Sequence, residues 1–274
     1  MKKTVLLLSG IMVMSCTSQQ KKLVYPETTK VDTIDVYFGT EVPDPYRWLE
    51  NDTSAATAAW VEAENKVTNA YLAQIPFREQ LLKRLTDLAN YEKIGTPFKK
   101  HGKYYFYKND GLQNQSVLYV QDSLDGEARV FLDPNQLSDD GTVALTSLSF
   151  SNDGKYTAYT ISRSGSDWSE IYVMDTATGK LLEDHINWAK FTGAAWQKDG
   201  FYYSAYDAPA KGKEFSNVNE NHKIYYHKIG TPQAEDKLIY ENPAYPKRFY
   251  SAGTSKDERI LFIYESGAGR GNNL

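Results

Sequence analysis

The stretch NDGKYTAYTISRSGSDWSEIYVMDTATGKLLED, residues 152–184, decides the fold because it contains a whole structural repeat unit. It begins with an Asp-Gly turn and continues with a run of strand-forming residues that ends near Arg163. A polar loop follows, and a second apolar run is centred on Tyr172. Alternation with a period of two is typical of β-strands, so this stretch predicts two paired strands.

Two other stretches, residues 101–133 and 198–241, align with this one. Each contains a turn with glycine, an aromatic-rich strand, a polar loop and a second strand centred on tyrosine. The central tyrosines are Tyr119, Tyr172 and Tyr225, which are 53 residues apart in both intervals. The sequence therefore repeats with a period of about fifty residues.

A unit of this length holds four short strands, and such a repeat predicts a blade of a β-propeller. The fold class is therefore predicted to be mainly β, with blades at about 91–140, 141–190 and 191–245 and an incomplete fourth blade at 246–274. Asp153 and Asp199 precede the turn glycines, so we interpret both as turn-forming residues. Gly154 and Gly200 are expected to supply the positive φ angles of these turns.

The fourth copy opens at residues 255–274 and ends where the third strand of a blade is due to begin. Alignment places Leu274 near the position of Ile171, so this blade is expected to lack its third and fourth strands. A propeller of fewer than about four blades does not close, and this chain has about three and a half. We therefore expect these residues to be the front part of a longer protein.

The first twenty residues combine two lysines with a short apolar run, which is typical of an export signal. The run leads to Cys16 in a context that resembles a bacterial lipoprotein signal, which predicts lipidation at Cys16. Ordinary signal cleavage is the alternative. Both predict a periplasmic or lipid-anchored protein. Cys16 is the only cysteine, so a disulfide within the chain is excluded.

Residues 21–90 are predicted to form a helical segment that precedes the propeller. The motif DPYRWLE, residues 44–50, predicts a turn, and a helix capped by Asp52 or Thr53 is expected to follow it. A second short helix is expected after Pro76. From residue 91 onward strands replace helices.

The net charge is −4, with acidic and basic residues interspersed, so the sequence lacks the broad basic face that nucleic-acid binding requires. Twenty-one tyrosines favour half-buried positions in a sheet. No cofactor is indicated. Membrane association is expected only through a lipid at the N-terminus.

The order and spacing of DPYRWLE, VEAENKVT, GSDW and AAWQKDG closely resemble those of the prolyl oligopeptidase family over residues 25–274. The resemblance implies a serine-type prolyl endopeptidase that cleaves short peptides after proline. It also implies a seven-bladed propeller that admits substrates by size, with the N-terminal segment packed on a C-terminal α/β-hydrolase domain. That domain is expected to follow residue 274.

The resemblance also assigns candidate substrate-binding residues. In the family an aromatic residue in the motif K-F-x-x-x-A-W-x-x-D-G borders the peptide site, and Phe191 occupies this position. Phe249 stands in place of a second cavity-facing residue. Simple packing within a blade is the alternative for both. Residues 264–267 depart from better-known members, so we expect no established contact from that loop.

Catalytic residues are expected to lie outside this chain. The G-x-S-x-G pattern of a hydrolase nucleophile does not occur in the sequence. His222 and His227 are five residues apart, so on an extended strand they point to opposite faces and cannot share a metal ion. Structural roles are predicted for them and for His101 and His185.

Three hypotheses for the function follow. The first is the N-terminal part of a secreted prolyl oligopeptidase, inactive by itself, whose partners are short proline-containing peptides and its own hydrolase domain. The second is a lipoprotein that binds peptides without cleaving them, with the fourth blade completed by another chain. The third is a non-functional gene remnant.

Overall fold

The computed structural model describes residues 22–215, 217–267 and 272–273. The predicted signal segment with Cys16 and most of the glycine-rich loop at 267–271 lie outside the described residues. The chain divides into two compact units, Met1–Leu82 and Lys83–Leu274, which are considered separately. No helix within the described ranges is long and apolar enough to cross a membrane.

The N-terminal unit contains a β-hairpin that the sequence did not reveal. Its strands are β1 (Ile34–Tyr37) and β2 (Thr40–Pro43), which pair in antiparallel fashion. The two residues between them, Phe38 and Gly39, both have positive φ, as a tight hairpin requires. A 3-10 helix, η1 (Arg47–Glu50), follows.

Charged contacts fix the turn formed by DPYRWLE. The Arg47 guanidinium pairs with Asp35 of the hairpin, with Asp44 at 3.1 Å and with Glu50 at 2.8 Å. The indole N–H of Trp48 donates a hydrogen bond of 2.8 Å to the carbonyl oxygen of Thr29. This motif therefore joins the start of the chain, the hairpin and the following helix.

Two helices follow the turn, α1 (Ala55–Leu72) and α2 (Arg78–Ala89). The N-cap of α1 is Ser54, whose hydroxyl accepts from the N–H of Thr57, so the prediction of Asp52 or Thr53 as the cap was wrong by one or two residues. Serine caps a helix as well as aspartate does, and local sequence did not separate the candidates. The leucines of α2 expose 51–55% of their surface; they are Leu81, Leu82, Leu85 and Leu88.

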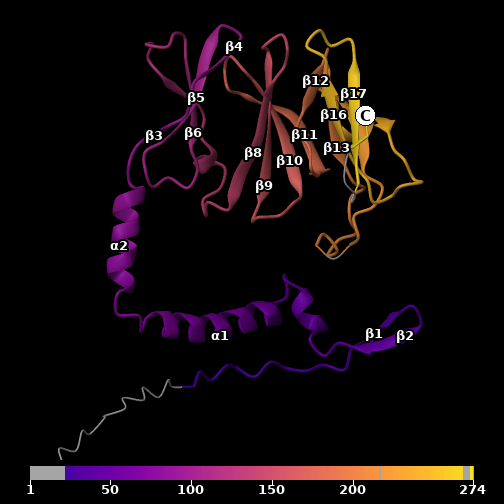
Figure 1. Cartoon of the computed structure of the whole chain (residues 1–274). Helices are drawn as coiled ribbons and strands as arrows, with labels where there is room; N and C mark the ends of the chain where they lie inside the picture. Colours follow the sequence, from indigo (N-terminus) through magenta and orange to yellow (C-terminus); the bar gives the residue numbers. More distant parts are fainter. Residues whose placement is uncertain (1–21, 216, 268–271, 274) are drawn as a thin grey trace, which may run out of the picture. The chain divides into compact units, whose positions relative to one another are not determined.

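The second unit confirms the predicted β-propeller class. Its strands form three antiparallel sheets of five, eight and three strands, which stand side by side in Figure 1. The eight-stranded sheet consists of two blades joined only by the pairing of Ala189 with Ala205, so the strands fall into four groups. The first group, blade 1, contains β3 (Lys93–Ile94), β4 (Phe98–Lys100), β5 (Lys103–Asn109), β6 (Val117–Gln121) and β7 (Arg129–Leu132). Blade 2 contains β8 (Val143–Phe150), β9 (Tyr156–Arg163), β10 (Ser169–Asp175) and β11 (Leu181–Ala189). Blade 3 contains β12 (Ala195–Gln197), β13 (Gly200–Ala205), β14 (Lys223–Lys228) and β15 (Lys237–Tyr240).

Blade 4 contains β16 (Phe249–Thr254), β17 (Leu261–Ser266) and β18 (Asn272–Asn273). The expectation that this blade lacks a third strand was wrong, because β18 pairs with Glu265 and Ser266 of β17. The alignment of Leu274 with Ile171 places Asn272 opposite Ser169, where β10 begins, so the register was right. The start of the equivalent strand in blade 2 was taken two residues too late, because the ends of strands are not marked in local sequence.

The predicted repeat is visible as one aromatic pair in each of the first three blades. Tyr119 stacks on Phe106 with 5.6 Å between ring centroids, and Tyr172 stacks on Tyr159 at 5.6 Å. Tyr225 stacks on Tyr203 at 5.7 Å. In every case the two residues are directly opposite each other on adjacent strands, β5 and β6, β9 and β10, or β13 and β14. The three central tyrosines are therefore structurally equivalent.

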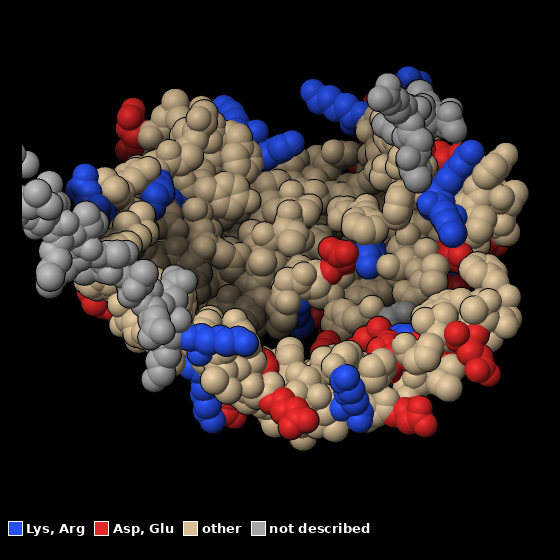
Figure 2. Space-filling view, turned by 60° about the horizontal axis from the view of Figure 1, so that its bottom comes forward, with Lys and Arg blue, Asp and Glu red and all other residues tan. Residues whose placement is uncertain are grey.

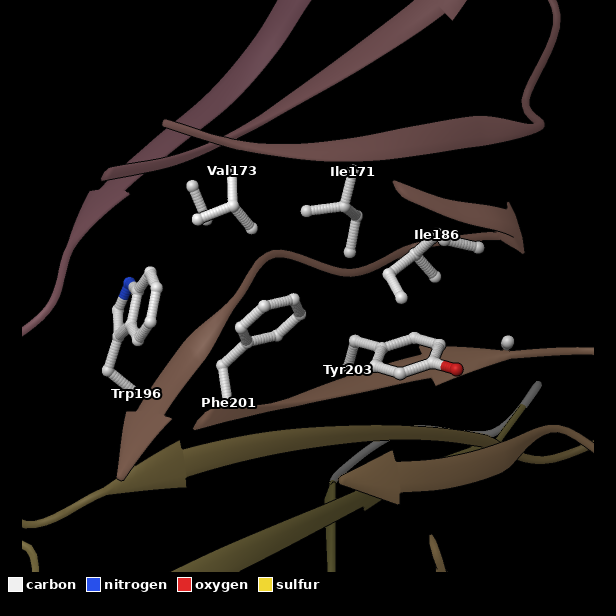
Figure 3. Close-up of a cluster of buried hydrophobic side chains, with 9 residues drawn as sticks. Ile171, Val173, Ile186, Trp196, Phe201 and Tyr203 are labelled. Atoms are coloured by element: carbon white, nitrogen blue, oxygen red, sulfur yellow. The ribbon is translucent and has the colours of Figure 1, made fainter. Parts of the chain in front are cut away.

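The core lies between the blades. Figure 3 shows the cluster between blades 2 and 3, where Ile171, Val173 and Ile186 face Trp196 and Phe201. Each of these five side chains exposes 5% of its surface or less. The alternate residues of β10, such as Met174, pack toward blade 1 instead. Each middle blade thus buries both faces, which is why its strands lack a polar face.

The turn glycines differ in what they contribute. Gly154 has φ +75°, as predicted, but Gly200 does not have positive φ; Lys198 takes that conformation instead. Glycine is required at 200 because a Cβ atom there would lie 2.0 Å from the carbonyl oxygen of His227. The structural role of Gly200 is thus a close approach of two strands.

The turns between the first two strands of blades 2, 3 and 4 are joined by Glu258. Its carboxylate accepts hydrogen bonds from the Asn152 side chain at 2.6 Å and from the N–H of Lys198 at 2.8 Å. Its carbonyl oxygen accepts from the Gln197 side chain at 2.7 Å. One residue thus links three blades at this end of the propeller.

Candidate functional site

The structure brings the two predicted site residues together. Phe191 lies in the connection from blade 2 to blade 3, and Phe249 begins the first strand of blade 4. Their rings meet edge to face, with 5.3 Å between centroids and an angle of 89°. Phe191 is 52% exposed and Phe249 is 38% exposed, so the pair offers an apolar surface to solvent.

The backbone beside this pair is in an unusual conformation. Trp188 has φ +58° and Phe191 has φ +53°, although neither is a glycine. Bulky residues rarely adopt the left-handed region, and such conformations persist where the surroundings hold them. The chain therefore changes direction at Trp188 and again at Phe191, on either side of Ala189 and Lys190.

His222 holds this segment in place. It is fully buried, and its Nε2 atom lies 3.0 Å from the carbonyl oxygen of Lys190. Its Nδ1 atom accepts a hydrogen bond of 2.9 Å from the N–H of Tyr250. An imidazole that accepts at Nδ1 is neutral, and burial lowers the pKa of His222 to about 4. A single neutral ring therefore connects the Phe191 segment with the strand that carries Phe249.

Lys190 places a positive charge beside the aromatic pair. Its side chain is only 8% exposed, and its Nζ lies 3.8 Å from the Asp167 carboxylate. Nζ is also 4.7 Å from the ring centroid of Trp168 and 5.5 Å from that of Phe191. Among the described residues, no hydrogen-bond acceptor lies within bonding distance of this ammonium.

A cavity of about 290 Å³ opens beside Trp168. Its apolar walls are formed by Trp168, Trp188 and Phe215, and Glu170 is among its polar lining residues. The Glu170 carboxylate accepts from Arg163, from the Tyr172 hydroxyl and from His185. Burial opposes its ionisation, but these hydrogen bonds prevail and lower the pKa of Glu170 to about 2. The carboxylate is thus fully paired within the protein.

A buried charged cluster lies between blades 2 and 3. His227 Nδ1 is 2.7 Å from the Asp236 carboxylate, and its Nε2 is 3.0 Å from that of Asp184. All three side chains are at most 3% exposed. Burial lowers the pKa of His227, but the hydrogen bonds and charges of Asp236 and Asp184 outweigh this, so the net shift is upward. The ring is therefore favoured as a cation between two carboxylates.

The four histidines have separate partners, as their spacing predicts. His222 contacts blade 4, whereas His227 contacts blade 2, and His185 stacks on Tyr172. His101 lies in the turn between β4 and β5. Within the described ranges there is no group of three or more histidine, cysteine or acidic residues that could hold a metal ion.

Residues 264–267 include a structural ion pair. Glu265 pairs with Arg248, whose guanidinium lies over the Tyr245 ring at 3.6 Å. The expectation of a loop at residues 264–267 was therefore wrong for its first three residues, which belong to β17 and are tied to the connection between blades 3 and 4.

The sequence did not indicate the roles of Lys190, Trp168 and His222. Lys190 was recognised only as part of a motif, and its burial depends on Trp168, which is 22 positions earlier in the chain. The motif GSDW contains both Asp167 and Trp168, which was the one available signal. Nothing in a linear pattern places GSDW beside Lys190.

Antiparallel blades that pack face to face, two of them joined into one eight-stranded sheet, define this unit as a β-propeller domain. Residues 26–274 match the family described as prolyl oligopeptidase, N-terminal beta-propeller domain. The chain belongs to this family.

Curated relatives agree with this assignment. A prolyl endopeptidase of Elizabethkingia miricola is 51% identical over 254 residues, which cover 92% of this chain and 36% of the relative. A prolyl endopeptidase of Elizabethkingia meningoseptica gives the same figures. The chain thus spans little more than a third of the length of these relatives.

A solved structure of prolyl oligopeptidase B from Galerina marginata, bound to a 35mer hydrolysis and macrocyclization substrate, is also similar. Its TM-score is 0.72 at 33% identity, and the match covers 88% of this chain and 37% of that one. A structure from a study of two prolyl endopeptidases gives a TM-score of 0.60 at 37% identity, and the match covers 90% of this chain and 36% of that one.

On the face shown in Figure 2, basic and acidic side chains are interspersed over the described surface, and no large patch of one sign is visible.

Proposed function

We propose that this chain is the propeller part of a serine-type prolyl endopeptidase that cleaves short peptides after proline. The observation that carries the proposal is the 51% identity to two prolyl endopeptidases over nearly the whole chain. The chain by itself is inactive, because a Ser–His–Asp set and its oxyanion donors are needed for such chemistry. These groups belong to a hydrolase domain that follows the propeller.

The propeller selects peptides by size and contributes contacts to them. Phe191 and Phe249 are the proposed contacts, because their exposed edge-to-face rings form a ready apolar platform. An aromatic platform suits a proline ring or another apolar side chain. A platform supported by a buried histidine keeps its geometry when no peptide is bound.

The N-terminal helical segment is proposed to dock on the hydrolase domain. The half-exposed leucines of α2 support this, because a row of leucines facing water is unusual without a partner. The export signal with Cys16 supports a location in the periplasm or at the cell envelope, with lipid attached to Cys16.

The test is to express the complete product of the reading frame and, separately, residues 21–274. Hydrolysis of a fluorogenic Gly-Pro substrate is expected from the complete product only. If the complete product ends at Leu274 and binds proline-containing peptides without cleaving them, the protein is instead a binding lipoprotein. Hydrolysis of the substrate by residues 21–274 alone would contradict the proposal that the catalytic groups lie in the hydrolase domain.

A further inference from the structure

Lys190 is a buried cation whose bonding capacity is largely unused. Its Nζ carries three N–H donors, yet the nearest carboxylate oxygen, on Asp167, is 3.8 Å away and so beyond hydrogen-bond distance. The remaining neighbours are two aromatic faces, which attract a cation but accept no strong hydrogen bond. Nζ is not among the buried polar atoms without a partner in the described residues, so the tip of this largely buried side chain reaches solvent and is free to bind a ligand.

Asp167 shows the direction from which a partner can approach. Its side chain is 70% exposed, so the space beside this carboxylate is open to solvent. Because the carboxylate is exposed and 3.8 Å from Nζ, this ion pair contributes little and can be replaced without large cost. A carboxylate that arrives from solvent can therefore take the place of Asp167 at closer range.

The ammonium and the aromatic platform are close enough for one small molecule to contact both. Nζ lies 5.5 Å from the Phe191 ring centroid, and that centroid lies 5.3 Å from the centroid of Phe249. Neighbouring residues of a peptide are spaced about 3.8 Å apart at Cα, so adjacent residues span this distance.

We propose that Lys190 is a specificity-determining residue that binds a carboxylate of a short peptide while an adjacent apolar residue rests on Phe191 and Phe249. This proposal rests on the peptide-binding function proposed above. The carboxylate comes from an acidic side chain or from the peptide C-terminus, and these two sources share one chemistry. The Trp168 ring, with its centroid 4.7 Å from Nζ, stabilises the ammonium through a cation–π contact.

The test uses the complete product of the reading frame and three peptides with no cleavable bond after proline. The probes are acetyl-Glu-Phe-pyrrolidide, its Gln counterpart, and acetyl-Phe-Pro with a free carboxylate. Affinities are measured by calorimetry for the wild type and for Lys190→Met, Lys190→Arg and Asp167→Asn. Lys180→Met, at an exposed turn lysine, is the matched control.

At least one carboxylate probe is expected to bind about tenfold more tightly than the Gln probe, as a charge-assisted hydrogen bond provides. Lys190→Met abolishes this preference, Lys190→Arg keeps it, and Asp167→Asn strengthens it by roughly two- to fivefold. Whichever probe shows the preference identifies the source of the carboxylate. Thermal melting of each variant verifies that it is folded.

Two results would overturn the proposal, and they have different consequences for the proposed peptide-binding function. If the Gln probe binds but charge makes no difference, or if Lys190→Met keeps the preference, Lys190 has no role in specificity while peptide binding stands. If no probe binds to the folded wild type, the proposed peptide-binding function fails as well.

Discussion

The Nδ1 atom of His222 accepts a hydrogen bond of 2.9 Å from the backbone N–H of Tyr250. This direction fixes the ring in its neutral form and gives the fully buried histidine a structural purpose. The blade 4 strand and the Lys190 carbonyl are joined through it, so the aromatic platform depends on one imidazole.

Acid should destabilise the fold through His222. Its pKa is about 6.5 in the unfolded chain and about 4 in the folded one, so its contribution is present above pH 6.5 and is lost as pH falls toward 4. The full difference amounts to about 3 kcal/mol. Urea unfolding between pH 4 and 7 is expected to show this loss, and His222→Gln is expected to flatten that part of the profile. An unchanged slope in the variant would assign the acid sensitivity to other groups.

Alkali should act through His227 with the opposite sign. Its folded pKa is raised, so its stabilisation is complete below the unfolded value of about 6.5 and declines as pH rises through the folded pKa. Unfolding free energies measured from pH 6 to 10 should therefore fall more steeply in the wild type than in His227→Gln. Parallel profiles would show that the cluster does not exchange a proton in this range.

Removing the His227 ring should also destabilise the fold at neutral pH. In His227→Leu the carboxylates of Asp184 and Asp236 stay buried without the cation between them, which costs about 3–5 kcal/mol. Lys228→Gln is the control, because Lys228 is on the same strand and pairs with the exposed Asp199. The control is expected to cost less than about 1 kcal/mol. Equal losses of unfolding free energy in His227→Leu and Lys228→Gln would mean that the buried cluster stabilises the fold no more than the exposed Lys228–Asp199 pair does.

Gly200→Ala tests the close approach of β13 and β14. A Cβ 2.0 Å from a backbone oxygen cannot be accommodated without moving a strand, so a loss of at least about 3 kcal/mol is expected in chemical denaturation. Gly165→Ala has open space and only a positive φ to overcome, so it should cost about 1–2 kcal/mol. A larger loss in Gly165→Ala than in Gly200→Ala would refute the steric explanation.

Phe191→Ala and Phe249→Ala should weaken peptide binding more than they weaken the fold. Both rings are partly exposed, and their edge-to-face contact is worth about 0.5–1.5 kcal/mol. We expect a loss of affinity of about three- to tenfold for each in calorimetry with a proline-containing peptide. Leu238→Ala, at an exposed position on an outer strand, should leave affinity unchanged. Affinity that survives both Phe substitutions would place the peptide elsewhere.

The sequence predicted the repeat because blades are alike at the residues that pack between their strands. The equal spacing of Tyr119, Tyr172 and Tyr225 corresponds to one stacked pair in three blades. The fold class and the family could be predicted for the same reason. The start of β18 was misplaced because Ile171, and not Ser169, was taken as the first residue of the equivalent strand β10, and strand ends carry little local signal.

The site was harder to predict from sequence than the fold. Phe191 and Phe249 came from the family motif, but their contact depends on two blades meeting around His222. Lys190 is a charged residue in a connection between blades, and residues of that kind are usually exposed, so its burial was unexpected. The role of Gly200 was also misjudged, because the steric contact comes from a strand whose approach the local sequence does not encode.

Glu258 gives the two ends of this propeller unequal mechanical freedom. It hydrogen-bonds to Asn152, Lys198 and Gln197 and so connects three neighbouring blades. A rotation that separates these blades at this end must break several of these hydrogen bonds at once. At the opposite end the blades are tied by different residues: the His222 ring joins Lys190 to blade 4, and the Trp168 indole donates to the Glu214 carbonyl oxygen between blades 2 and 3. Loss of one side chain is therefore expected to loosen three blades at the Glu258 end but only two at the other end.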